Sequence, residues 1–300
     1  MKRFFKIISS LALALIMCLG TVGLVGCGAD IRTANLTLQI YDYANSEFYS
    51  EDDVALSVDL YAHLAPKTVE AMEKYINDGY YDNAIFYQID GYKQIMFGDL
   101  KIDGDKLEIE DNGATVNVVL NSIKPKLPGE YEYGGTVGSD LVNKKGSVGL
   151  WRGWYDAGTD WMSSSASDTG RATWFMPTES ISSYNSYFCV FGQIDFEKES
   201  NTKAFSALNS AFEKDNCTSL IIYYTEKDGG YDPTKDDYNL EFHCVTEEYF
   251  DSLEDDEVEA LNIFEAEGRQ LETFNKYEIK VPNNSANGLS GAKIKSAKMA

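Results

Sequence analysis

Histidine and proline are scarce in this 300-residue chain, which holds two histidines and six prolines. With His63 and His243 as the only histidines, and no nucleophile-elbow motif, nothing supports a Ser-His-Asp triad. No C-x-x-C spacing occurs among the five cysteines, so neither zinc nor a dithiol redox motif is indicated. The acidic runs at 99–105 and 228–237 lack the calcium-loop pattern of an EF-hand and are interpreted as solvated turns. No metal site is expected.

Basic residues are also few, with 26 Lys and Arg against 48 Asp and Glu. If the first 26 residues are removed, 23 basic residues remain and the net charge becomes −25. Such a charge repels phosphate backbones and anionic headgroups, so nucleic acid is not an expected partner. The hydrophobic share of 44% is that of an ordinary globular protein, and it predicts a sizeable core after the leader.

The apolar run at 7–19 is shorter than the ~20 residues that a spanning helix needs. It follows three basic residues and precedes small ones, so residues 1–26 are expected to be a cleaved export signal. The segment Leu24-Val25-Gly26-Cys27 resembles the lipobox of bacterial lipoproteins, in which the cysteine becomes the acylated first residue of the mature chain. We therefore expect a lipid anchor such as palmitate on Cys27, with residues 27–300 at the extracytoplasmic face of the cell membrane.

Three cysteines remain beyond the leader and the anchor. Cys189, Cys217 and Cys244 allow either one disulfide with a spare thiol or three buried thiols, and the sequence leaves both open.

Apolar residues alternate with polar ones in several short segments, as in strands with one buried face. Between Pro66 and Gly79 they recur at helical spacing, and those two residues suit the start and the end of a helix. Asp111-Asn112-Gly113 marks a hairpin turn, and residues 152–171 show no period and are expected to form a loop. The expected strands are 36–40, 54–60, 107–109, 116–120, 219–224, 238–245, 277–281 and 292–298, and the expected helices are 66–78, 202–212 and part of the acidic segment 247–272.

Residues 60–86 read LYAHLAPKTVEAMEKYINDGYYDNAIF and resemble the cyclophilin family of peptidyl-prolyl isomerases. Three later fragments keep the family's order, namely Gly98-Asp99, GSVGL at 146–150 and VFGQI at 190–194. The resemblance covers residues 54–194, and Ile294-Lys295-Ser296 resembles the closing strand. It implies a mostly β fold, a closed eight-stranded antiparallel barrel capped by two helices, with a peptide groove on its outer face. Residues 217–282 are then an α+β insertion before the last strand of a domain spanning 27–300.

In the cyclophilin family an arginine donates to the prolyl nitrogen as amide resonance is lost, and Gln88 occupies its position here. Glutamine is a neutral donor, and charge-assisted hydrogen bonds are roughly twice as strong. Met96 and Thr173 stand where the family has glutamines, whereas Phe175 matches the floor of its proline pocket. The resemblance assigns to the substrate groove and its rim Phe86, Tyr92, Met96, Trp151, Arg152, Thr173, Phe175, Tyr184 and Phe188.

Two arginines at the ends of the expected loop, Arg152 and Arg171, are the cations nearest in sequence to the groove. Each is considered as a replacement for the missing arginine, with a solvated surface side chain as the alternative. The tryptophans around the same edge, including Trp151, are interpreted either as core residues or as an aromatic platform for an extended peptide.

Three hypotheses follow. The first is a peptidyl-prolyl isomerase and folding factor for exported proteins, with weakened activity and no cofactor. The second is a catalytically silent module on the cell surface that binds proline-containing peptides. The third is a structural envelope lipoprotein with a vestigial groove.

Overall fold

The structure is a computed structural model that describes residues 30–50, 54–104, 106–122, 124–130, 141–152, 170–185, 187–213, 216–232, 237–263, 276–284 and 289–300. The chain divides into Met1–Asp30 and Ile31–Ala300, and the description below concerns the second unit. The expected signal peptide, Cys27 and most of the expected 152–171 loop lie outside the described residues. Within the part that is described, no helix is long and apolar enough to cross a membrane.

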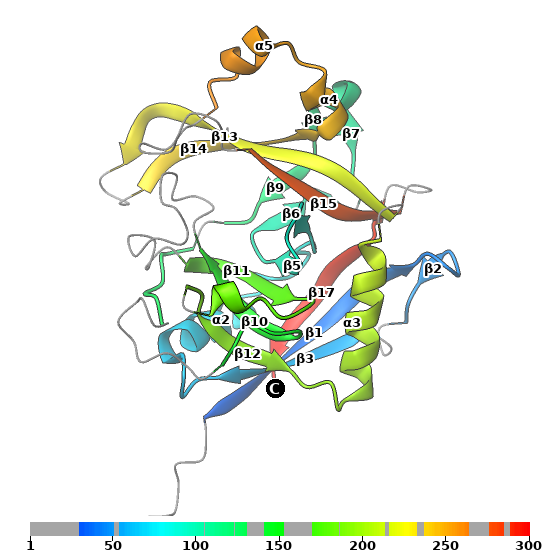
Figure 1. The fold of residues 1–300 in the computed structure, drawn as a ribbon, viewed down its shortest axis with the longest axis vertical. Coiled ribbons are helices and arrows are strands. Elements are labelled where there is room, and N and C mark those ends of the chain that lie inside the picture. The colour runs from blue at the N-terminus through cyan, green and yellow to red at the C-terminus, as the bar shows by residue number, and fades with distance from the viewer. Residues whose placement is uncertain are drawn as a thin grey trace, which may run out of the picture. The chain divides into compact units, whose positions relative to one another are not determined.

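An antiparallel sheet of eight strands, called the main sheet below, forms the larger part of the fold (Figure 1). The strands follow the order β17-β1-β3-β12-β10-β11-β5, and β2 pairs with β1. The alternation seen in the sequence is real, because buried residues recur at every second position of β1 and β3. The strands are β1 (Ile31–Asp42), β2 (Glu47–Phe48), β3 (Ala55–Tyr61), β5 (Gln94–Phe97), β10 (Ser147–Arg152), β11 (Gly170–Pro177), β12 (Val190–Ile194) and β17 (Ala292–Met299).

The two ends of this strand path are linked through residues 83–87. On one side, Ile85 bridges to Lys293 of β17 and Phe86 N–H donates to the Ala292 carbonyl over 3.2 Å. On the other, Tyr87 and Met96 of β5 exchange two backbone hydrogen bonds of 3.0 and 2.8 Å. The mostly β, curled antiparallel architecture that the sequence predicted is therefore confirmed, with isolated bridges rather than a continuous strand at this point.

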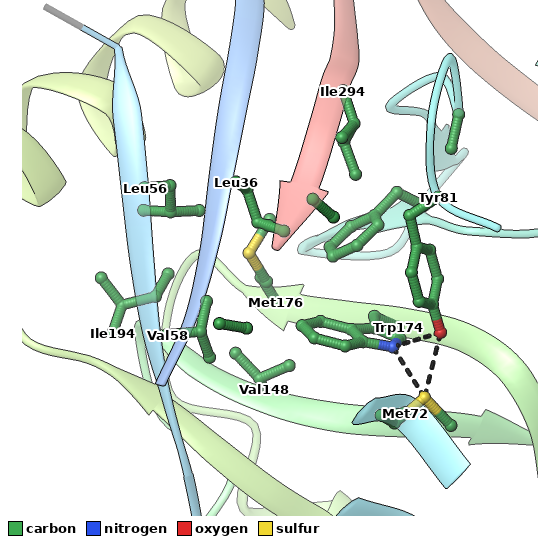
Figure 2. Packing of buried hydrophobic residues seen from close by; sticks show 14 of the residues in the cluster. Leu36, Leu56, Val58, Met72, Tyr81, Val148, Trp174, Met176, Ile194 and Ile294 are labelled. Atoms are coloured by element: carbon green, nitrogen blue, oxygen red, sulfur yellow. Dashed lines mark hydrogen bonds between the residues drawn. The ribbon is translucent and has the colours of Figure 1, made fainter. Parts of the chain in front are cut away.

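The inner face of the main sheet holds a large apolar cluster (Figure 2). At its centre Trp174 Nε1 donates to the Tyr81 hydroxyl over 2.7 Å, and that hydroxyl lies 2.9 Å from the Ala172 carbonyl and 3.0 Å from Met72 Sδ. The two buried polar groups are thus satisfied within the cluster, which avoids the penalty of an unpaired donor in the core. Trp174 and Met176 of β11 point to this inner face.

Two helices pack against the main sheet, and both were predicted: α2 (Pro66–Asn77) and α3 (Glu199–Ala211). Ala65, the residue that caps α2, provides no side-chain acceptor. Instead the buried carboxylate of Glu130 accepts from Lys67 N–H over 3.0 Å and from Thr68 N–H over 2.7 Å. A carboxylate at this end also complements the positive end of the helix dipole.

The segment expected as an insertion forms a second sheet, called the insertion sheet, in the order β14-β13-β15-β16. Figure 1 shows it between the main sheet and two short helices. The predicted strand pair is confirmed, although β13 and β14 are longer than the apolar runs indicated. The elements are β13 (Cys217–Asp232), β14 (Asp237–Thr246), α4 (Glu247–Asp251), α5 (Asp255–Ala260), β15 (Lys276–Asn284) and β16 (Leu289–Ser290).

Smaller elements complete the described chain. The predicted hairpin is confirmed, because β7 and β8 pair around the 3-10 turn at Asp111–Gly113, in which Asn112 has a φ of 54°. The remaining elements are β4 (Gln88–Ile89), β6 (Leu100–Ile102), β7 (Ile109–Glu110), β8 (Thr115–Val116), β9 (Val118–Leu120) and a 3-10 turn at Ser182–Tyr184.

Replacing Glu130 with alanine is expected to lower the free energy of unfolding by about 1–3 kcal/mol, because two backbone donors at the start of α2 lose their acceptor. Urea unfolding measures the change. Glu70, an exposed carboxylate on the same helix, provides the control, and Glu70→Ala is expected to stay within about 0.5 kcal/mol of wild type. Equal losses in the two variants would contradict a capping role for Glu130.

Candidate functional site

The outer face of the main sheet carries a row of three neighbouring residues from three strands. Gly149 of β10 lies opposite Phe175 of β11, and Phe175 lies opposite Met96 of β5. The Phe175 ring lies so close to Gly149 that a Cβ added there would stand 2.3 Å from the ring. A side chain at position 149 would therefore clash with the Phe175 ring, which packs over Gly149 where the cyclophilin resemblance placed the floor of a proline pocket.

Four further aromatic side chains surround Phe175. The ring of Trp151 stacks on that of Phe188 at 5.0 Å and 14°, and it meets the Phe175 ring edge-on at 5.9 Å. Tyr184 lies 4.8 Å from Phe188, and Tyr92 lies 6.2 Å from Trp151. The structure thus brings together Tyr92, Trp151, Tyr184 and Phe188 with Phe175 and Met96, all of which the resemblance assigned to the groove and its rim. These rings form a compact aromatic wall. The interpretation of Trp151 as a core residue therefore fits the structure better than its interpretation as an exposed platform for a peptide.

A polar group sits within these apolar surroundings. The Tyr87 hydroxyl donates to Asp99 Oδ1 over 2.8 Å, and the Thr173 side chain also hydrogen-bonds to the Asp99 carboxyl. Burial raises the pKa of Asp99 to about 6, and the two side-chain hydrogen bonds oppose that rise. Thr173, expected at the groove, thus serves as a partner of Asp99.

Gln88 stands apart from this cluster. It is half-buried and lies between Tyr87 and Ile89, whose side chains both belong to the buried apolar cluster that contains Phe175 and Met96. Strand alternation directs the Gln88 side chain to the opposite face, and Tyr87 is the neighbour that reaches the buried acid. Phe86 also corrects the prediction, because it packs against Phe97 in the inner cluster at 5.2 Å instead of lining the groove.

The two candidate replacement arginines are not exposed loop residues, so that part of the prediction was wrong. Arg152 ends β10 and Arg171 lies in β11, and their exposed fractions are 3% and 7%. The Arg152 guanidinium lies over the Phe188 ring, 5.4 Å from its centroid. Arg171 donates to the Lys124 carbonyl over 2.7 Å. Arg152 is therefore the cation that the structure places beside the aromatic wall.

The insertion sheet covers this outer face. Apolar side chains from β13, β14 and β15 share one buried cluster with Met96, Phe175 and Phe188. We call it the outer cluster, and its buried members are Ile85, Tyr87, Ile89, Met96, Leu100, Ile102, Leu107, Val116, Val118, Trp151, Phe175, Tyr184, Phe188, Leu220, Ile222, Tyr224, Cys244, Ile279 and Val281. Met96 and Phe175 are each 0% exposed, so the groove that the sequence predicted is closed in this structure.

The free energy that holds this cover in place is large. Burial of one apolar side chain contributes about 1.5–3 kcal/mol, so the five apolar insertion residues Leu220, Ile222, Tyr224, Ile279 and Val281 contribute roughly 8–15 kcal/mol. The whole stability of a domain is about 5–15 kcal/mol. Apolar burial of this size favours the covered state.

Other candidate groups lie away from the outer face or are inert. His63 is exposed, and His243 stacks on Tyr223 at 4.9 Å while its Nε2 lies 2.8 Å from Thr225 Oγ1. Cys189, Cys217 and Cys244 form no disulfide, and burial raises the pKa of the Cys189 thiol to about 12. Among the residues that the structure describes, no group of three or more His, Cys, Asp or Glu could hold a metal ion.

A comparison with protein-family profiles matches residues 47–221, more than half of the chain, to the family described as cyclophilin type peptidyl-prolyl cis-trans isomerase/CLD. The chain belongs to the cyclophilin family. Membership supports peptidyl-prolyl isomerase activity in general. The matched region ends within β13, so nearly all of the insertion sheet lies beyond it.

Similar solved structures include a cyclophilin type peptidyl-prolyl cis-trans isomerase from Cryptosporidium parvum, with 13% identity, a TM-score of 0.34, and coverage of 72% of this chain and 97% of that one. The same parasite protein in the presence of the dipeptide Ala-Pro gives 14% identity, a TM-score of 0.33, and coverage of 71% and 98%. No curated protein sequence matches this cyclophilin.

Two features of the site were missed at the sequence level. The Tyr87–Asp99 pair had a signal in the sequence, because Tyr87 stands where the family has a histidine. It was missed because Asp99 was interpreted only as the end of a turn. The cover was not detectable, because no periodicity in residues 217–284 tells which surface their apolar face contacts.

Asp99 gives a pH dependence that can be measured. Its folded pKa of about 6 exceeds the ordinary value of 3.8, so between these values the folded state binds more protons than the unfolded state. This carboxyl therefore lowers the free energy of unfolding as the pH rises from 4 to 7, by about 3 kcal/mol in total. Urea unfolding of wild type and Asp99→Asn across that range is expected to show this loss in the wild type only.

Tyr87→Phe tests the partner in the same experiment. The hydroxyl lowers the pKa of Asp99, so its removal is expected to raise that pKa and extend the loss of stability to higher pH. Identical pH profiles for wild type and Asp99→Asn would refute the raised pKa.

Proposed function

We propose that this cyclophilin is a peptidyl-prolyl isomerase and folding factor for exported proteins, with strongly weakened activity. The observation that carries the proposal is the apolar site that this chain shares with its family. In it the Phe175 ring packs over Gly149 beside Met96 and Phe188. This is the part of the family's site that holds a proline ring, and it is assembled from three separate strands and a loop.

Rotation about a prolyl bond requires loss of amide resonance, a barrier of about 18–20 kcal/mol. An isomerase lowers it by binding the twisted bond more tightly than either planar form. In this chain the residue at the arginine position is neutral, and Gln88 lies outside the outer cluster. Each ~1.4 kcal/mol lost from transition-state binding slows the reaction tenfold, which supports weak rather than full activity.

A second candidate is a catalytically silent module that binds proline-containing peptides at the cell surface. The polar groups favour it, because Gln88, Met96 and Thr173 all depart from the residues of the family's site while the aromatic wall persists. Peptide binding without turnover would distinguish this module from the isomerase.

The proposed site of action is the extracytoplasmic face of the cell membrane, with lipid on Cys27 as the anchor. The lipobox-like Leu24-Val25-Gly26-Cys27 supports this placement, as does the short apolar run before it. The excess of acidic residues suits contact with unfolded protein chains better than contact with anionic headgroups or nucleic acid.

A protease-coupled prolyl assay tests the isomerase. Wild type is expected to accelerate isomerisation weakly, and Gln88→Arg is expected to leave kcat/KM within about twofold of wild type, because strand alternation directs residue 88 to the face away from Phe175. A gain of about tenfold in Gln88→Arg alone would instead place residue 88 at the prolyl bond, where a charged donor is stronger than a neutral one. Gln193→Arg provides a matched control, since Gln193 is also half-buried but lies in β12 and pairs with β10. We expect wild-type activity from this control. Absence of any acceleration in wild type and in Gln88→Arg would refute the isomerase.

Cys27→Ser tests the anchor. The thiol that would be acylated is lost, so the protein is expected to move from the membrane fraction to the soluble fraction and to stop incorporating labelled palmitate. Cys18→Ser, a change within the expected signal peptide, is the control and should leave both properties intact. Membrane retention of Cys27→Ser would contradict lipid anchoring at this residue.

A further inference from the structure

We infer that β13 and β15 act as a built-in ligand of the cyclophilin groove, which occupies the site of a peptide and excludes peptides from outside. The inference concerns whether a peptide can enter the groove. It rests on the proposed isomerase activity only in the part of the test that measures turnover. Three contacts carry it, one with the outer cluster and two with residues 88–90, which join the insertion sheet through β4.

The first contact is made by alternate side chains of β13. Leu220, Ile222 and Tyr224 belong to the outer cluster with Phe175 and Met96. Ile221 and Tyr223 point to the opposite face, where they pack with Phe250 of α4 in a separate cluster. Residues 220–224 of β13 are therefore buried on both faces, and the side chains of one face belong to the cluster that contains the groove residues.

The second contact is a backbone pairing. β15 pairs antiparallel with β4, so that Ile279 lies opposite Ile89 and Lys280 opposite Gln88. Asp90 N–H donates to the Glu278 carbonyl over 2.8 Å, which extends the pairing by one residue. An extended segment that adds a strand beside a binding site and inserts alternate side chains is a general mode of peptide recognition. Here the extended segment comes from the same chain.

The third contact closes the rim. Lys280 of β15 forms an ion pair with Asp90, which follows β4 directly. Ile279 and Val281, on either side of Lys280, are 0% exposed within the outer cluster. The charged partner at the edge and the apolar partners beneath it fix β15 in one register. A proline-containing peptide can therefore reach Phe175 only after β13 and β15 have left the outer face.

The test compares two aspartate substitutions at adjacent, buried positions of β13. Ile222→Asp places a charge against the groove, whereas Ile221→Asp places the same charge against α4. The probe is a fluorescein-labelled Ala-Ala-Pro-Phe peptide, and binding to the full chain is followed by anisotropy. We expect Ile222→Asp to bind it at least about 30-fold more tightly than wild type, because a buried charge without a partner favours the open state. Ile221→Asp is expected to bind as weakly as wild type.

Equal binding by wild type and Ile222→Asp, or by the two variants, would overturn the inference. Binding by Ile222→Asp without turnover would refute the isomerase while it upholds the built-in ligand. The integrity of the main sheet is followed by the hydrogen exchange of amides in β1 and β3.

If Ile222→Asp unfolds the main sheet, Ile222→Ala and Ile221→Ala decide the matter by hydrogen exchange. Ile222→Ala is expected to accelerate exchange at Asp90 N–H, where β4 pairs with β15, by about 30-fold or more relative to β1. Uniform acceleration across β1, β4 and β15 would overturn the inference, because the insertion sheet would then unfold only together with the main sheet.

Discussion

Both faces of β11 are buried along its whole length, and the rest of the structure depends on that constraint. Trp174 and Met176 point into the inner cluster, while Thr173 and Phe175 point to the outer face. A sheet that is apolar on both sides must be covered on both sides. Helices and the curled sheet itself cover the inner side. On the outer side β13, β14 and β15 contribute the apolar side chains of the cover, so the insertion sheet completes the burial that the main sheet requires.

The outer cluster nevertheless contains an acid. Asp99 remains there because Tyr87 and Thr173 satisfy its oxygens, which is the condition under which a carboxyl can be buried. Tyr224 of the insertion sheet belongs to the same cluster, so the acid also lies beneath the cover. The polar centre of this cyclophilin is therefore an internal tyrosine–carboxyl pair, whereas Gln88, the residue after Tyr87, is half-buried and outside the outer cluster.

The sequence predicted the regular elements well, because each has a local signature. Period-two alternation in β1 and β3, and helical spacing behind Pro66, correspond to faces that are buried in the structure. The assignment of Phe86 to the groove failed for a physical reason, since a shift of one residue along a strand moves a side chain to the other face. The capping of α2 by Glu130 was also invisible, because 62 residues separate Glu130 from Thr68.

The pairing of β1 with β17 joins the two ends of the described chain, with Ala34 opposite Met299. Leu36 of β1 lies between Leu56 of β3 and Ala297 of β17, so β1 gains its second long neighbouring strand only when residues 292–299 are present. Contacts between such distant segments require closure of a very long loop, which slows folding. The order of events is thereby constrained, because the hydrophobic inner face cannot be completed until residues 292–299 are available to pair with β1.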